Sequence, residues 1–134
     1  MTVTLIIISG WLLMPLGALH LFFPRYFNWK NDLKPLSLIN RQLMEVHTFF
    51  LGLTVCLLGL LCASSADALT STSLGRRICF GMALFWGARL LVQFFWYSSA
   101  LWRGKLFETV VHVVFSMLWT SLTVLYGIAI WQNQ

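Results

Sequence analysis

The sequence predicts an all-α integral membrane protein, a single antiparallel four-helix transmembrane bundle, and two observations support this. The chain is 59% hydrophobic and only 10% charged, whereas soluble domains carry about 25% charged residues. Its apolar residues also fall into four stretches separated by short polar segments, and each is long enough for a span of about 20 residues. The stretches show no alternation of apolar and polar residues, which favours helices over the strands of a membrane barrel.

The charge and the cysteines exclude several classes of protein. The net charge is +5, but the basic residues flank the spans and form no long run, so they indicate membrane topology and argue against nucleic-acid binding. The three cysteines are Cys56, Cys62 and Cys79. They form no C-x-x-C pair, which argues against a dithiol oxidoreductase. The apolar composition makes the lipid bilayer the predicted partner.

The first span is expected at about residues 3–23. Pro15 should kink this helix, and Gly10 and Gly17, seven residues apart, mark a face that can approach another helix closely. Residues 24–36 follow as a loop in which aromatic and basic side chains suit the headgroup region.

The second span is expected at about residues 37–63, with Ser37 as a plausible N-cap. One face of this helix carries a stripe of small residues, which predicts a close helix contact. The stripe consists of Gly52, Cys56, Gly59 and Ala63. Residues 64–75 are short and polar and are typical of a turn.

The third and fourth spans are expected at about residues 78–100 and 106–131. Arg89 and Gln93 lie four residues apart in the third span, and Glu108 and His112 lie four residues apart in the fourth. Residues at this spacing share one face of a helix. Ionisable groups inside apolar spans are costly, so each pair marks a candidate functional site.

Four antiparallel helices with short connections would bring most of the polar residues into one half of the bilayer. We therefore expect a polar half-chamber near one membrane surface. Its predicted members are His20, His47, Arg89, Gln93, Glu108 and His112.

The basic residues predict the orientation. Six of them lie at the surface next to the half-chamber, and only Arg76 and Arg77 lie at the other. The six are Arg25, Lys30, Lys34, Arg41, Arg103 and Lys105. The positive-inside rule then places the half-chamber toward the cytoplasm and both termini outside it, in an inner membrane of the bacterial type.

The first functional hypothesis is a haem or metal site for redox chemistry or electron transfer. His47 and His112 fall at matched depth on two helices, as the axial ligands of a haem b in a membrane bundle do, with Arg89 available to neutralise a propionate. Alternatively, His20, His47 and His112 hold one transition metal, with Glu108 as a ligand or as a partner of a ligand.

The second hypothesis is a small-molecule site without metal. Arg89 and Gln93, together with a histidine, would hydrogen-bond a quinone carbonyl or the anionic head of a lipid. In this interpretation Glu108 and Arg89 are the candidate catalytic residues, and Glu108 and His112 act as acid and base.

The third hypothesis is structural. The same polar groups would close hydrogen bonds between helices, and the protein would serve as an accessory subunit of a larger membrane complex or as a homo-oligomer.

Overall fold

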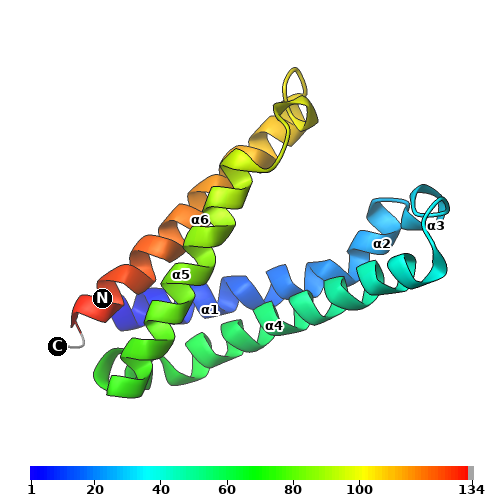
Figure 1. Cartoon of the computed structure of the whole chain (residues 1–134). Coiled ribbons are helices and arrows are strands. Elements are labelled where there is room, and N and C mark those ends of the chain that lie inside the picture. Colours follow the sequence, from blue (N-terminus) through cyan, green and yellow to red (C-terminus); the bar gives the residue numbers. More distant parts are fainter. Residues whose placement is uncertain (133–134) are drawn as a thin grey trace. The chain divides into compact units, whose positions relative to one another are not determined.

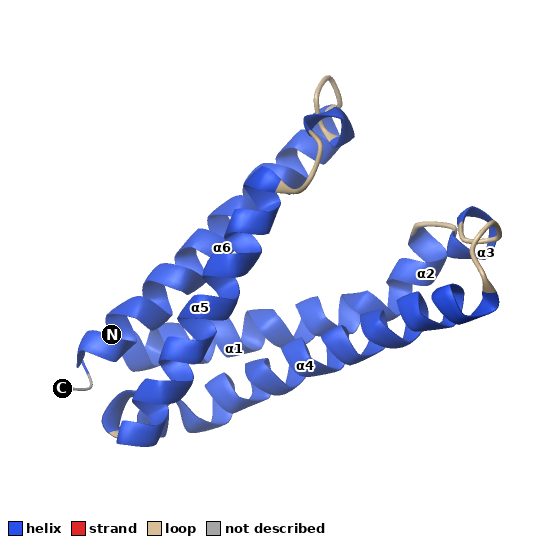
Figure 2. Cartoon of the chain, in the orientation of Figure 1, coloured by secondary structure: helices blue, strands red, loops and turns tan. Residues whose placement is uncertain are grey.

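The computed structural model describes residues 1–132, in which helices are joined by short loops (Figures 1 and 2). Four helical segments are long and apolar enough to cross a membrane, as a multi-pass membrane protein requires. These segments are Thr2–Tyr26, Leu38–Ser71, Ser73–Phe95 and Leu106–Gln132. The all-helical class and the four apolar helices predicted from the sequence are thereby confirmed.

The chain divides into two compact units. The first, here called the α1–α4 unit, comprises Ile6–Ala66, and the second, the α5–α6 unit, comprises Asp67–Gln134 with Met1–Leu5. Each unit contains a pair of long helices. Association of all four helices into one bundle stays a prediction.

The α1–α4 unit contains two long helices and three short ones. The helices that lie in it wholly or for most of their length are α1 (Thr2–Leu19), η1 (His20–Phe22), α2 (Phe23–Tyr26), α3 (Trp29–Asp32) and α4 (Leu38–Ser71). The expected loop at 24–36 thus contains two one-turn helices. Pro24 lies in the first turn of α2, where its missing N–H leaves no helical hydrogen bond unmade.

Glycines bring α1 and α4 together almost backbone to backbone. A Cβ added to Gly10 would lie 2.5 Å from the backbone of both Gly59 and Ala63. One added to Gly17 would lie 2.6 Å from the carbonyl oxygen of Gly52. Because the earlier glycine meets the later part of α4, the two helices run antiparallel. The small-residue contact expected from the sequence is confirmed.

The end of α4 differs from the expected turn at 64–75. The helix continues to Ser71, with one residue, Ser65, outside helical geometry (φ −132°, ψ 25°). Within this helical segment serine hydroxyls donate to carbonyls of the preceding turn: Ser64 to Leu60, at 2.7 Å, and Ser71 to Asp67, also at 2.7 Å. This back-bonding satisfies the hydroxyls without ending the helix.

The break comes at Thr72, whose extended backbone separates α4 from α5 (Ser73–Phe95). The Thr72 hydroxyl accepts a hydrogen bond from the Gly75 N–H at 2.9 Å and so caps α5. A Cβ on Gly75 would lie 2.6 Å from the Cα of Leu69. The thiol of Cys79 donates to the Leu69 carbonyl at 3.6 Å. These contacts make a tight corner between α4 and α5.

The α5–α6 unit is an antiparallel pair of helices that lie side by side (Figure 1). After α5 come η2 (Ser99–Leu101) and α6 (Leu106–Gln132). The indole rings of Trp86 and Trp119 stack with centroids 5.0 Å apart. Gly104 adopts φ +79° just before α6, a left-handed conformation that glycine accepts without strain.

The glycine contact gives the first testable prediction. Gly10→Ala should lower the free energy of unfolding by about 1–3 kcal/mol, because the new methyl group would overlap the backbone of α4. The measurement is unfolding of the purified protein in mixed detergent micelles, followed by circular dichroism.

The matched control is Gly127→Ala in α6, where an added Cβ has nothing within 4 Å. This variant should be unchanged or more stable by up to about 1 kcal/mol, since alanine is the better helix former. Equal stability of the two variants would show that the α1–α4 contact is looser than described.

Candidate functional site

Arg89 and Gln93 lie one turn apart on α5, as their spacing predicts. The guanidinium Nη1 of Arg89 donates to Oε1 of Gln93 at 3.1 Å. Gln93 is buried, with 7% of its surface exposed. The arginine therefore hydrogen-bonds a neutral amide on its own helix.

The amide of Gln93 continues across to α6. Its Nε2 lies 2.7 Å from Nδ1 of His112, so three of the residues singled out from the sequence form one hydrogen-bonded set. We call it the Arg89–Gln93–His112 network. The two helices contribute residues 19 positions apart in the chain.

The donors and acceptors fix the direction of this network. A guanidinium can only donate, so the oxygen of the Gln93 amide must face Arg89. The amide nitrogen then faces His112 and also can only donate, so Nδ1 of His112 accepts. A neutral imidazole that accepts at Nδ1 carries its proton at Nε2. His112 therefore presents an N–H donor at Nε2.

Aromatic rings enclose the imidazole of His112. The indole of Trp102 stacks on it with centroids 3.9 Å apart and planes 11° from parallel, and the ring of Phe94 meets it edge-on at 6.0 Å. The Thr109 hydroxyl donates to the Trp102 carbonyl at 2.8 Å and so ties this loop to α6. Trp102 is not among the residues singled out from the sequence, so its contact with His112 is one that the sequence did not predict.

The positive charge of Arg89 is spread over ring faces. Its guanidinium carbon lies 5.3 Å from the Trp119 ring centroid and 5.6 Å from that of Tyr97, within the range of a cation–π interaction. Within residues 1–132, the indole N–H groups of Trp119 and of Trp86 are buried without a hydrogen-bond partner. The polar atoms left unmatched around Arg89 are thus donors, and a ligand that accepts hydrogen bonds would complement them.

The other candidate residues take no part in the hydrogen bonds of this network. Glu108 is exposed in the first turn of α6, where a carboxylate interacts favourably with the helix dipole. Its role as an acid or base stays a prediction. His20 and His47 belong to the α1–α4 unit.

His20 and His47 differ from His112 in tautomer. Nδ1 of His20 lies 3.0 Å from the Leu16 carbonyl oxygen, and Nδ1 of His47 lies 2.8 Å from that of Leu43. A carbonyl oxygen only accepts, so Nδ1 of each imidazole carries the proton and Nε2 keeps its lone pair. Such a lone pair is what a metal ion requires.

Among residues 1–132, the structure brings together no group of three or more histidine, cysteine, aspartate or glutamate side chains that would hold a metal ion. His47 and His112 lie in different units. The haem pair and the three-histidine metal site therefore both stay predictions.

Comparison of the chain with protein-family models, with curated proteins and with solved structures found no match.

The direction of the network can be tested by nitrogen NMR of histidine-labelled protein in micelles. His112 should show a pyrrole-like Nε2 and a pyridine-like Nδ1, and His20 and His47 should favour the reverse. Arg89→Leu should shift His112 toward the other tautomer, because the Gln93 amide is then free to turn its oxygen toward Nδ1.

Arg103→Leu is the control, since it removes an exposed arginine of the same unit and should leave the His112 signals unchanged. A His112 spectrum matching those of His20 and His47 would contradict the assigned direction. So would a spectrum that Arg89→Leu does not alter.

Proposed function

We propose that this protein is a multi-pass protein of a bacterial inner membrane, with both termini outside the cytoplasm, and that its α5–α6 unit binds a quinone. The observation that carries the proposal is the Nε2–H donor of His112, oriented by Gln93 and Arg89. A quinone carbonyl oxygen is the complementary acceptor.

The surroundings of the donor also suit a quinone. Phe94 is 55% exposed and Trp96 is 83% exposed, so the surface around the network is apolar and aromatic. Quinones are flat and apolar and reach their sites through the lipid phase. Aromatic rings favour stacked or edge-on contact with such a molecule.

A neutral acceptor fits this site better than an anionic lipid head. The guanidinium of Arg89 already donates to Gln93 and lies over two ring faces. His112 is neutral in the assigned tautomer, so it adds a hydrogen bond but no second positive charge. We therefore favour a quinone over a lipid substrate at this position.

Haem or metal binding for electron transfer is the second candidate, and one observation favours it. Nε2 of His47 and of His20 keeps the lone pair that a metal needs. His112 would meet the same requirement only after the Gln93 amide turns over, which removes its hydrogen bond with Arg89. With either ligand, we propose that the protein acts as a subunit of a larger membrane complex or as a homo-oligomer.

The quinone proposal predicts which substitutions weaken binding. His112→Phe should lower the affinity for a short-chain ubiquinone roughly 2- to 13-fold, the net value of one hydrogen bond. Gln93→Leu should also lower the affinity, because without the Gln93 amide the proton of His112 is no longer held at Nε2. The measurement is quenching of tryptophan fluorescence during titration of the protein in micelles.

His47→Phe is the matched control, because His47 is exposed and its imidazole bonds its own helix. An equal loss of affinity in both histidine variants would overturn the proposal. Absorption spectra of the same sample, oxidised and reduced with dithionite, test the second candidate. A Soret band that His47→Phe abolishes would favour haem.

A further inference from the structure

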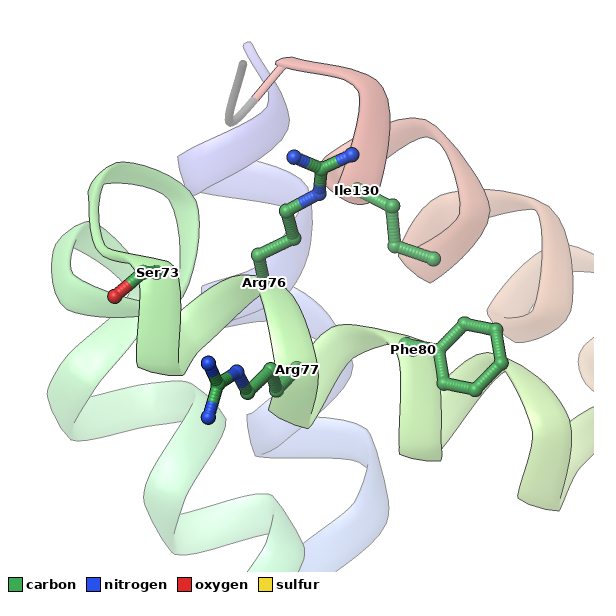
Figure 3. Close-up of a pocket in the computed structure, with 5 residues that line it drawn as sticks. All are labelled: Ser73, Arg76, Arg77, Phe80 and Ile130. Atoms are coloured by element: carbon green, nitrogen blue, oxygen red, sulfur yellow. The ribbon is translucent and has the colours of Figure 1, made fainter.

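A second group of unused polar residues lies at the other end of α5. Ser73, Arg76, Arg77 and Phe80 follow the spacing that places residues on one helix face. With Ile130 of α6 they line a surface hollow of about 480 Å³. In Figure 3 the side chain of Arg77 extends toward the Ser73 side of the helix, that of Arg76 extends toward the side of Ile130, and Phe80 lies further along the helix.

The charge of this hollow is positive. Arg76 and Arg77 are both exposed, and each guanidinium offers five N–H donors. The acidic residues of the described part of the α5–α6 unit are Asp67 and Glu108. Glu108 lies at the start of α6, away from the end that contributes Ile130, and Asp67 is exposed near the α4–α5 corner. The two positive charges of Arg76 and Arg77 therefore exceed the single negative charge of Asp67.

The polar and apolar groups are arranged in order along α5. The hydroxyl and the two guanidinium groups come first, and the phenyl ring of Phe80, 61% exposed, lies seven residues after Ser73. Seven residues span about 10 Å of helix. A phospholipid has the same order of groups, with a charged phosphate at the surface and acyl chains below it.

The α4–α5 corner fixes the orientation of this face. Gly75 and Cys79 are buried and contact Leu69. Arg76 and Arg77 are the next two residues of the helix. Both are exposed, so they lie on faces other than the one that packs against the corner. Both guanidinium groups are thus presented outward at the end of an apolar helix, where lipid headgroups lie.

We propose that this hollow binds the phosphate of an anionic phospholipid, with Arg76, Arg77 and Ser73 contacting the phosphate and Phe80 and Ile130 contacting an acyl chain. A free phosphate ion would use the arginines but not the ring. This inference does not depend on the quinone proposal, because it uses none of the same residues.

The test is native mass spectrometry of the detergent-purified protein titrated with phosphatidylglycerol. The double substitution R76Q/R77Q should weaken lipid binding roughly 30-fold, since each basic residue at a membrane surface contributes about 1 kcal/mol. Phe80→Ala should also weaken it, although the charge is unchanged. Phosphatidylcholine should bind more weakly than phosphatidylglycerol.

R103Q/K105Q is the matched control, because it removes two exposed positive charges from the other end of the same helices. An equal loss in this control would overturn the proposal and indicate attraction by net charge alone. Displacement of the lipid by an equal concentration of inorganic phosphate, with no effect of Phe80→Ala, would identify a free phosphate site and would also overturn it. Circular dichroism of each variant verifies that the helices are retained.

Discussion

The hydrogen bond between Gln93 and His112 determines the chemistry that the α5–α6 unit offers. In an apolar environment a polar group without a partner costs several kcal/mol, so the pairing of Arg89, Gln93 and His112 is strongly favoured. Arg89 has no acceptor atoms, and this single fact orients the Gln93 amide and then the imidazole proton of His112. Arg89, which acts on His112 through Gln93, thus determines whether the imidazole of His112 donates a hydrogen bond to a ligand or ligates a metal.

The two helix pairs are held together in different ways, and only one leaves room for side-chain chemistry. In the α1–α4 unit the backbones at Gly10 and Gly59 approach so closely that an added methyl group would overlap. In the α5–α6 unit the stacked indoles of Trp86 and Trp119 lie between the helices. Gln93 and His112 add a hydrogen-bonded bridge between these two helices. Small residues thus form the contact in the first unit, whereas large rings and a polar bridge form it in the second.

Much of this arrangement could be predicted from spacing. Gly10 and Gly17 predicted a close contact with another helix, and the four-residue interval between Arg89 and Gln93 predicted their shared face. Spacing carries no information on hydrogen-bond direction, so the tautomer of His112 required the contacts themselves. It also could not place Trp102, because the path of that loop depends on the left-handed conformation of Gly104. The segment 64–75 does contain the break between α4 and α5, at Thr72, and a kink at Ser65, but most of it is helical rather than an open turn.

The three arginines of α5 differ in their surroundings, and therefore in the kind of ligand that their charge favours. Arg89 donates to an amide and lies over two aromatic faces, so neutral groups already stabilise its charge. Arg76 and Arg77 are exposed beside an apolar ring and line a hollow, so their charge is available to an anion. A neutral acceptor at the first position and an anionic one at the second follow from these environments. The two proposals together would let one helix recognise two classes of lipid-phase molecule, one at each end, without sharing a residue between them.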